Sequence, residues 1–467
     1  MQGTSQQDVI VVGAGVAGLS AALALAGSGA RVTVLERRPY VGGRACSYLH
    51  PALDEVVDSQ HVMVGCCVNL VELSAAAGLT DKIRWYDEQT FLEPGGRSSR
   101  IGSSVLPAPL QYAPSFLGAG MLSLSDKLGM ARGLLEFFRG YPQQDDEDME
   151  TWLRRTGQSE RSIRHFWSPI LMATLNDRPS MCSTRYAGKV FHELFVKSSQ
   201  GGRLGIPTVP LSEFYQGFAD HLVQLGGRVE LRASVDSLVQ RDGRWCVTAA
   251  GTNYEADTVV LALPFEQTRR LLPALHSDHA AAGEVVADLD QRAQHLVHSP
   301  FTSILLWYDR EICTLDHAWL LDTTIEWFFH KSRIRRSPQQ QGSYVELVIA
   351  GSRAQLEISR EQILTEAQRE LALFFPEVKQ AKLRKSGILK DARATFSVTT
   401  GLDAVRPQQR TALPGLFLAG DWTQTEWPAT MEGAARSGRL AAGEVVGRRD
   451  RFMAPELPAE GLMRLLL

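Results

Sequence analysis

A glycine-rich turn near the start of the chain constrains its fold more than any other feature of the sequence. Residues 8–12, Asp-Val-Ile-Val-Val, are a short apolar run typical of a strand buried on both faces. Residues 13–18 read Gly-Ala-Gly-Val-Ala-Gly, and residues 19–26, rich in alanine and leucine, favour a helix. A second strand at 31–35 leads to an acidic residue, 18 positions after the last glycine. This G-x-G-x-x-G pattern between a strand and a helix predicts a Rossmann-like α/β domain that binds a dinucleotide.

The glycines of this turn have different tasks. Gly13 permits the tight turn, Gly15 lets a pyrophosphate approach the backbone, and Gly18 lets the helix pack closely on the strand. The free N–H groups at the start of the helix, on Val16 and Ala17, then face the phosphates, and the helix dipole favours negative charge there. We expect these five residues to form the pyrophosphate cradle.

The end of the second strand indicates which dinucleotide is bound. The carboxylate of Glu36, which Arg37 follows, can accept hydrogen bonds from ribose hydroxyls. The chain then reads Gly42-Gly43-Arg44, in which two glycines allow close backbone approach and a guanidinium can bind an anion through two N–H groups. This segment resembles the extension carried by FAD proteins of the glutathione-reductase-like superfamily. In their amine-oxidase and phytoene-desaturase branch it contacts the pyrophosphate. The resemblance implies FAD, with Arg37, Gly43 and Arg44 among its contacts; a nicotinamide-only dehydrogenase is the alternative.

A second signature near residue 420 points to the same cofactor. Residues 416–422 are an apolar strand that opens onto Gly420 and Asp421, and a small-residue helix follows Thr430 and Met431. In the same superfamily the Gly-Asp pair meets the ribityl chain and pyrophosphate, and the next helix points its N-terminus at the flavin ring. The two signatures lie about 400 residues apart, so the FAD-binding domain must be discontinuous.

Strand patterns in the middle of the chain supply the third part of this domain. Residues 229–235 and 257–264 are predicted strands on either side of a hairpin turn at 241–244. The resemblance implies that Val235 offers its backbone to the adenine. We expect an α/β fold, with a Rossmann-like FAD-binding domain of the glutathione-reductase type and a discontinuous α+β substrate or cap domain. The FAD-binding domain is predicted to span 1–90, 205–270 and 405–450, the cap 91–204 and 271–404, and a tail 451–467.

Length and composition exclude several other classes of protein. A chain of 467 residues exceeds one ordinary core of about 100–200 residues. Its 49 Lys and Arg against 52 Asp and Glu leave no basic excess for nucleic acid. Six scattered cysteines without C-x-x-C indicate reduced thiols rather than a disulfide scaffold or a metal site. We see no signal peptide and no membrane-spanning run. We therefore expect a cytoplasmic protein, free or peripheral on the inner face of the cell membrane, that binds neither nucleic acid nor metal.

Several internal stretches carry a finer resemblance. Residues 58–66, Asp-Ser-Gln-His-Val-Met-Val-Gly-Cys, resemble a D-x-G-Q-H segment, with Ser59 where glycine is usual. Three further stretches carry similar patterns. Residues 152–176 resemble W-L…F-W-x-P-L…A-x-L-N, residues 204–213 resemble L-x-x-P-x-V-P-L-S-x-L, and residues 421–433 resemble D-W-T…W-P-A-T-M-E-G. Over nearly its whole length the chain is similar to the squalene-associated, FAD-dependent desaturase-like group of the amine oxidase/phytoene desaturase superfamily.

The resemblance implies a reductive reaction on a long apolar isoprenoid. Reduced FAD would donate hydride from N5 to the allylic carbon of hydroxysqualene that loses its hydroxyl, giving squalene for hopanoid synthesis. Such a site needs a dry apolar tunnel and a proton source. His61 is the candidate catalytic acid because its motif places it, with Gln60, near the flavin and because its ordinary pKa lies near neutral pH. The competing interpretation is that His61 orders the backbone there. Phe166 and Trp427 are the candidate substrate contacts.

Two other functions remain open. An oxidative polyprenoid desaturase would run the same hydride transfer in reverse, and the Met-Glu-Gly-Ala segment shared by both groups does not separate them. A flavin amine oxidase or a non-catalytic FAD scaffold is the third possibility. Against an amine oxidase, the sequence shows no clear second aromatic residue beside Trp427 and no lysine at a matching position.

Two segments of the chain could touch a bilayer. Residues 112–139 are rich in Leu, Met and Phe with scattered cations, and residues 462–467 are a second short apolar segment. An ordinary amphipathic cap helix that faces its own core is the alternative for the first segment. We expect weak, reversible membrane association. Only one dinucleotide fingerprint is visible, so the electron donor stays unidentified.

Overall fold

The computed structural model describes residues 6–336 and 342–466, and a five-stranded parallel sheet organises its cofactor-binding end. The strand order is β10 (Arg228–Leu231), β2 (Arg31–Glu36), β1 (Asp8–Val12), β14 (Thr258–Leu261) and β21 (Leu416–Leu418). Three distant parts of the chain therefore meet in one sheet, as the sequence predicts, and the Rossmann-like α/β fold is confirmed. The first five residues of the predicted domain and Leu467 of the predicted tail lie outside the described residues.

Both faces of this sheet are buried, which explains the continuous apolar character of β1. Val9 and Val11 pack in one core with α1 (Val16–Gly27), α9 (Leu211–Gln224) and α16 (Met431–Val445). Ile10 and Val12 belong to a second core on the opposite face. Successive side chains of a strand point to opposite faces, so a strand covered on both sides has apolar residues at every position.

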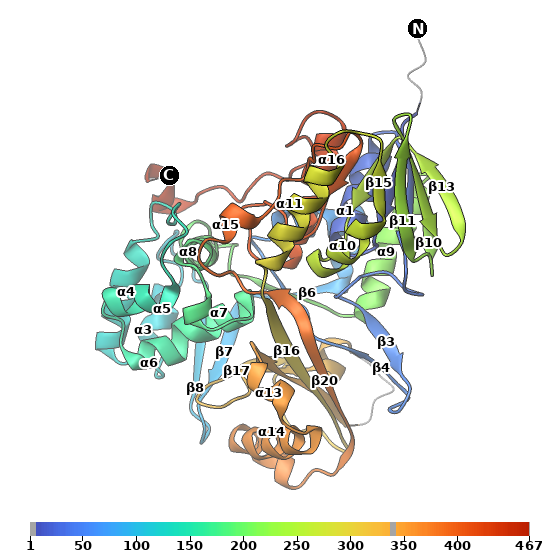
Figure 1. The fold of residues 1–467 in the computed structure, drawn as a ribbon. Coiled ribbons are helices and arrows are strands. Elements are labelled where there is room, and N and C mark those ends of the chain that lie inside the picture. The colour runs from blue at the N-terminus through green and yellow to red at the C-terminus, as the bar shows by residue number, and fades with distance from the viewer. Residues whose placement is uncertain (1–5, 337–341, 467) are drawn as a thin grey trace.

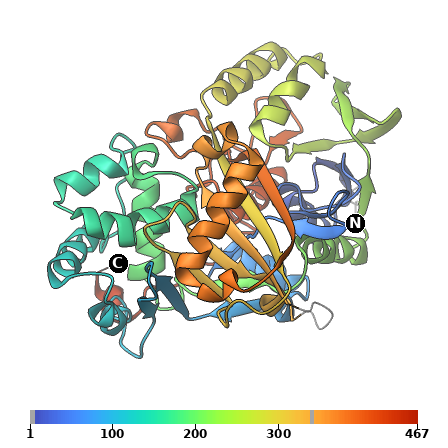
Figure 2. The ribbon, with the colours of Figure 1, turned by 90° about the horizontal axis from the view of Figure 1, so that it is seen from below.

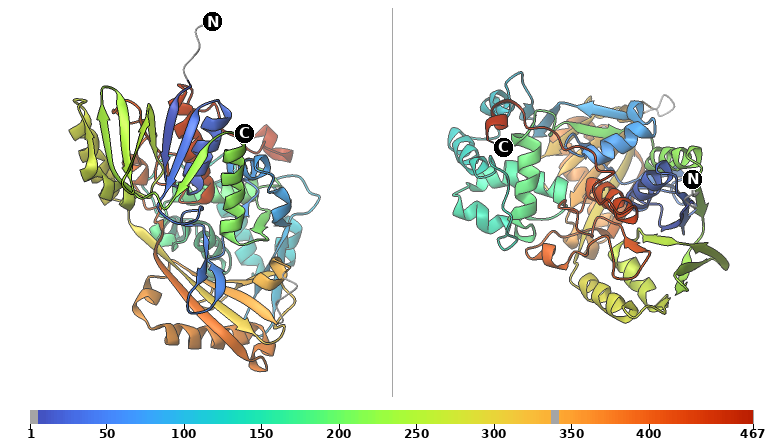
Figure 3. Two further views of the ribbon diagram at one scale, coloured as in Figure 1. Left: turned by 90° about the vertical axis from the view of Figure 1, so that its right-hand side faces the viewer. Right: turned by 90° about the horizontal axis from the view of Figure 1, so that it is seen from above.

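A four-stranded sheet covers that opposite face (Figures 1 and 3). Its order is β13 (Thr252–Ala256), β12 (Arg244–Ala249), β11 (Val235–Arg241) and β15 (Leu275–Ser277). The predicted hairpin at 241–244 is present, because Arg241 pairs with Arg244 across the turn. After α10 (Phe265–Leu271), β15 pairs in parallel with β11, and α11 (Ala282–Gln294) follows. Residues 275–277 thus hydrogen-bond to the sheet of the cofactor-binding end.

A seven-stranded sheet forms the floor of the second half of the molecule (Figures 1 and 2). Its order is β20 (Leu383–Phe396), β16 (His298–Tyr308), β19 (Ser343–Ala350), β18 (Trp327–His330), β17 (His317–Leu320), β7 (Glu88–Leu92) and β8 (Ser98–Gly102). The outer face is covered by α13 (Arg353–Glu357) and α14 (Arg360–Phe374). Along β18, Phe328 packs on the α14 side, whereas Trp327 and Phe329 face the interior of the molecule. That alternation gives the sheet an aromatic inner surface.

Helices of residues 113–196 form a lobe beside this sheet. They are α3 (Ala113–Gly118), α4 (Leu124–Leu135), α5 (Met149–Arg155), α6 (Glu160–Ser162), α7 (Ser168–Leu175) and α8 (Thr184–Phe191), with π-helical turns η2 (Ile163–Trp167) and η4 (His192–Val196). Asp148 caps α5 by accepting a hydrogen bond from the Thr151 N–H. No helix within the described ranges has both the length and the apolar character needed to cross a bilayer.

Short elements connect these parts. They are β3 (Ser47–His50), β4 (Glu55–Asp58), β5 (Met63–Val64), α2 (Val68–Ala76), β6 (Ile83–Tyr86), β9 (Leu204–Pro207), α12 (Lys331–Ile334), α15 (Leu402–Val405) and the C-terminal turn η7 (Gly461–Leu465).

Candidate functional site

The glycine turn has the geometry that its sequence requires. Gly13 has φ +104°, in the region that favours glycine, and a side chain on Gly18 would lie 1.9 Å from the Gly13 carbonyl oxygen. The loop of Gly42 and Gly43 crosses this turn, because the Gly42 N–H donates to the Ala14 carbonyl at 2.9 Å. A Cβ on Gly43 would come within 3.0 Å of the Gly15 Cα. The two glycine motifs, 24 or more residues apart in sequence, therefore form one narrow backbone cradle.

The donors of this cradle fit a pyrophosphate. Helix α1 begins after Gly15 without a side-chain cap, so its first N–H groups, on residues that include Val16 and Ala17, are free to bind an anion. Glu36 accepts hydrogen bonds from the N–H groups of Ala14 and Arg38, each at 2.8 Å. Carboxylate oxygens have about four acceptor sites in all, so Glu36 can still accept from ribose hydroxyls. These residues fit the adenosine and pyrophosphate parts of FAD.

Residues from both ends of the chain close the cradle. The Arg44 guanidinium pairs with the buried Asp421 carboxylate at 2.6 Å and also donates to the Ala394 carbonyl at 3.2 Å. Thr430 caps α16 through its hydroxyl, which accepts from the Gly433 N–H at 3.0 Å. Its hydroxyl is thus committed to the helix, which directs the free N–H groups of the first turn.

One cavity of about 830 Å³ unites nearly all of the predicted site residues. It is lined by Gly13, Gly15, Val16, Ala17, Glu36, Arg37, Gly43, Arg44, Gln60, His61, Val235, Gly420, Asp421, Trp427, Thr430 and Met431. Gly18 lies outside the lining, in the helix–strand contact that the sequence predicts for it.

Phe166 does not lie where the resemblance implied. It is buried in an aromatic cluster inside the helical lobe, where its ring contacts those of Phe116, Trp167, Phe191 and Phe195. It does not line the cavity. The motif around Phe166 therefore belongs to the packed interior of the lobe. Met172 and Ala173 of α7, which follow it in the chain, line the cavity instead.

His61 is held in one orientation at the cavity wall. Its Nδ1 lies 2.9 Å from the Ser59 carbonyl oxygen. Because a carbonyl oxygen only accepts, the neutral ring carries its proton on Nδ1 and leaves Nε2 as an acceptor. Burial lowers the pKa of His61, against the opposing effects of the Ser59 hydrogen bond and the Asp58 charge. The neutral ring at pH 7 favours an ordering or proton-accepting role over proton donation.

A buried ionic network supports the loop of residues 59–61, and sequence reasoning missed it. Lys331 bridges Asp58 and Glu346, the latter at 2.6 Å, and all three side chains are at most 1% exposed. Glu346 accepts from the Gln60 N–H at 2.8 Å, and Arg335 pairs with Asp58 at 2.7 Å. The network joins β4, α12 and β19 to the loop. Asp58 and Gln60 lie 273 or more residues before the partners that they meet in the network. Local sequence patterns therefore carry no signal for it.

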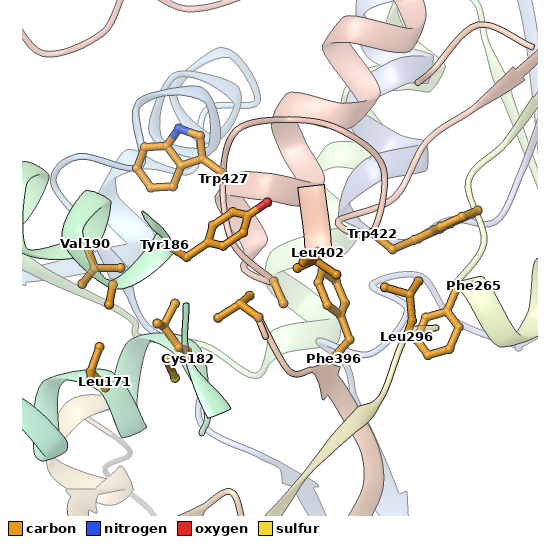
Figure 4. Close-up of a cluster of buried hydrophobic side chains, with 14 of the residues drawn as sticks. Leu171, Cys182, Tyr186, Val190, Phe265, Leu296, Phe396, Leu402, Trp422 and Trp427 are labelled. Carbon is orange, nitrogen blue, oxygen red and sulfur yellow. The ribbon is translucent and has the colours of Figure 1, made fainter. Parts of the chain in front are cut away.

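The remainder of the cavity is mostly apolar. Its walls come from the helical lobe and from the inner face of the seven-stranded sheet, and they include Met172, Val190, Leu194, Phe301, Trp319, Trp327, Phe329 and Val348. Figure 4 shows Trp427 close to Tyr186 and Val190 of α8. Lys189, also missed from the sequence, lies on the lining with its Nζ 5.1 Å from the centre of the Trp427 ring. A second unpredicted polar group, Glu326, lies on the sheet wall.

The fold and this cavity together define an FAD-dependent oxidoreductase, with a nucleotide cradle that opens into an apolar chamber. A family model described as flavin-containing amine oxidoreductase matches residues 16–446, and the chain belongs to that family. Its cofactor is FAD, as the sequence predicts. A purely nicotinamide-dependent class is thereby excluded.

Similarity to known proteins extends over nearly the whole chain. The chain is 28% identical over 467 residues to 15-cis-phytoene desaturase of Synechococcus elongatus, covering 95% of this chain and 97% of that protein. It is 26% identical over 466 residues to the chloroplastic/chromoplastic 15-cis-phytoene desaturase of Solanum lycopersicum, covering 95% of this chain and 78% of that one. In fold it resembles the crystal structure of an oxidoreductase from Methanosarcina mazei, with TM-score 0.71, 16% identity, and 94% and 100% of the two chains covered.

Proposed function

We propose that this protein transfers a hydride between FAD and an allylic carbon of a long apolar isoprenoid. The observation that carries the proposal is the single cavity that joins the FAD cradle to a chamber walled by aromatic and aliphatic side chains. Bound FAD would supply hydride chemistry at its N5 atom. The protein would bind and orient the chain of the substrate and exclude water from the reacting carbon.

The direction of the transfer separates two candidates. The chain is similar over nearly its whole length to relatives named phytoene desaturase and zeta-carotene desaturase, and this similarity supports oxidative desaturation more directly than it supports dehydroxylation. The reductive removal of the hydroxyl of hydroxysqualene is the second candidate. It is supported by the resemblance of residues 58–66, 152–176 and 204–213 and by a carboxyl, Glu326, in the apolar part of the cavity. A hydrocarbon substrate offers that carboxyl no polar partner, whereas an allylic alcohol does.

The cavity gives less support to an amine substrate. Lys189 and Arg436 both place a cation near the Trp427 ring, at 5.1 and 5.6 Å from its centre. The Lys189 charge would repel a protonated amine that approached the aromatic wall, whereas Arg436 is paired with Glu456 at 2.6 Å and is not part of the cavity lining.

An anaerobic single-turnover experiment tests the proposal. Photoreduced holoenzyme is mixed with detergent-solubilised hydroxysqualene, and oxidised holoenzyme is mixed with phytoene. Return of the oxidised flavin spectrum with squalene as product establishes dehydroxylation, and bleaching with a desaturated product establishes desaturation. Absence of both reactions in folded, FAD-loaded protein would contradict hydride transfer to a polyprenoid.

We propose that His61 takes part in the same reaction by exchanging a proton through its Nε2 atom. His61→Ala should retain FAD, because the side chain contributes no bond to the cradle residues of 13–18. Single turnover should fall by about 10²-fold if Nε2 exchanges a proton with the substrate or its water. A fall of less than about threefold, with the usual flavin spectrum, would leave His61 only the task of ordering the loop at Ser59.

We also propose a peripheral contact with an anionic bilayer. Leu117, Leu124, Leu128 and Leu135 of α3 and α4 are each at least 58% exposed. The loop 105–110 adds further exposed apolar residues and lies beside η7, because the Leu462 N–H donates to the Ala108 carbonyl at 2.9 Å. Exposed leucines with interspersed cations such as Lys127 are typical of surfaces that enter the headgroup region.

Flotation with vesicles that contain anionic lipid checks this contact. The triple change L124S, L128S and L135S should lower the bound fraction at low salt by about tenfold or more, since each leucine contributes roughly 1 kcal/mol when partly buried. The change V223S with L225S, at exposed apolar positions at the end of α9 on another part of the surface, is the control (Figure 1). Equal flotation of the two variants would contradict a contact through α4.

A further inference from the structure

Glu326 stands out as a carboxyl in the apolar part of the cavity. It immediately precedes β18, and its main chain is fixed to β19 because the Glu326 N–H donates to the Val348 carbonyl at 3.0 Å. The Glu326 Oε2 accepts from the Ala350 N–H at 2.7 Å. Both neighbours on the wall, Trp327 and Val348, are apolar and line the same chamber. One oxygen of the carboxyl is therefore fixed to the sheet, and Glu326 lines the space where substrate would lie.

This carboxyl has little to stabilise a negative charge. Among the described residues no Lys, Arg or His forms an ion pair with Glu326. Burial raises the pKa of Glu326 to about 8, against opposing effects of the Ala350 hydrogen bond and of the charge on Arg178. Other charged groups nearby are engaged elsewhere. Glu370 of α14 accepts from the N–H groups of Thr324 and Ile325, and Asp322 pairs with His165 at 2.9 Å. Glu326 is thus a neutral acid at pH 7.

We propose that the Glu326 carboxyl is the hydrogen-bond and proton donor to an oxygen on the isoprenoid substrate, an allylic hydroxyl. This inference rests on the proposed hydride transfer in its reductive direction. The C–O bond breaks with its electron pair on oxygen, and the oxygen takes the Glu326 proton and leaves as water. The allylic carbon gains the hydride from reduced FAD, and the Glu326 carboxylate is reprotonated from solvent water. Two electrons leave the flavin and two enter the new C–H bond.

Three of the other polar groups on the cavity lining are less suited to this step. His61 commits its Nδ1 to the Ser59 carbonyl, and burial lowers its pKa. Glu193 is paired with Lys197 at 3.2 Å, and Asp421 with Arg44 at 2.6 Å. A carboxylate in an ion pair has no proton to give near neutral pH.

Two substitutions separate binding from proton transfer. Glu326→Gln keeps an N–H donor but has no transferable proton, and Glu326→Leu has neither. Glu361→Gln, on the solvent side of α14, is the matched control. Oxidised holoenzymes are titrated with hydroxysqualene and with squalene, followed by the flavin spectrum. Photoreduced holoenzymes are then followed through single turnover with hydroxysqualene from pH 6 to about pH 9, a range that spans the Glu326 pKa.

The wild type and Glu361→Gln should bind hydroxysqualene at least about fivefold more tightly than squalene, the effect of one hydrogen bond. Their turnover should fall as pH rises through about 8. Glu326→Gln should keep the binding preference but lose about 10²-fold or more in turnover, with no fall near pH 8. Glu326→Leu should lose both the binding preference for hydroxysqualene and the turnover.

Three results would overturn parts of this inference in distinguishable ways. Wild-type turnover in Glu326→Gln, with the same pH profile, would remove the proton-donor role. A binding preference that survives in Glu326→Leu would remove the contact with substrate oxygen. A wild type that prefers hydroxysqualene but does not turn it over would overturn the reductive function and the proton transfer, while the contact would stand.

Discussion

Lys331→Met should lower the free energy of unfolding by about 3–5 kcal/mol, because it leaves buried carboxylates without their shared cation. Lys331 is 1% exposed and bridges Asp58 and Glu346, neither of which has exposed side-chain surface. Asp58 keeps Arg335, whereas Glu346 loses its only ion pair among the described residues. Urea unfolding of the holoenzyme, followed by flavin fluorescence and circular dichroism, measures the loss.

A surface lysine provides the control. Lys385 forms a comparable 2.6 Å pair with Glu55, but its side chain is 43% exposed, and Lys385→Met should cost at most about 1 kcal/mol. Adding Glu346→Gln to Lys331→Met should recover part of the stability, since it removes the unpaired charge. Equal losses for the two lysine variants would contradict a buried network.

Acid should weaken the network in a defined direction. Burial alone would raise the pKa of Asp58, but the charges and hydrogen bonds of Arg335 and Lys331 hold it well below its usual range. A carboxyl with a lowered pKa in the folded state stabilises the protein above its unfolded pKa, near 3.9, and loses that contribution as pH falls further. Lys331→Met should show a smaller loss of stability between about pH 5 and pH 2 than the wild type.

The cofactor half of the molecule was predictable because its signals are local. Gly13, Gly15, Gly18 and Glu36 occupy one strand–turn–helix–strand unit, so their spacing in the sequence is enough to identify them. The second signature at Gly420 is equally local, and the parallel sheet brings its strand β21 next to β14, which in turn pairs with β1 of the first signature.

The substrate half was less predictable because its walls come from distant strands. Glu326 and Phe301 reach the cavity only through the pairing of β16, β18 and β19, and neither lies in a motif that would single it out. Lys331 meets Asp58 across 273 residues. Phe166 lies in a recognisable motif, but sequence similarity alone does not say which face of the helical lobe its ring joins.

The direction of catalysis depends on this less predictable half. The cradle is shared by oxidative and reductive flavoenzymes, so its residues cannot choose between them. A neutral acid on an apolar wall does distinguish the reductive reaction from the oxidative one, because it has a function only when the substrate carries a hydrogen-bond acceptor atom.

Three alanine substitutions in one turn and helix should separate folding from FAD binding. Gly18→Ala places a Cβ 1.9 Å from the Gly13 carbonyl oxygen, so the backbone must move. We expect a loss of about 3 kcal/mol or more in stability, at the upper end of overpacking costs, together with loss of FAD. Thermal unfolding of the apo and FAD-loaded proteins measures both.

Gly15→Ala should act on the cofactor alone. Its Cβ would lie 3.8 Å from the Gly43 Cα, an ordinary contact, so the apoprotein should keep its stability. The same methyl group narrows the path by which a pyrophosphate reaches the backbone of the cradle. The Kd for FAD should rise about 10–100-fold, corresponding to roughly 1–3 kcal/mol. Gly27→Ala, at the other end of α1 with no atom within 4 Å of the added carbon, is the matched control and should stabilise the protein by up to about 1 kcal/mol. An unchanged FAD affinity in Gly15→Ala would contradict pyrophosphate binding at this turn. The other two variants cannot give this test, because Gly18→Ala disturbs the fold and Gly27→Ala lies away from the ligand.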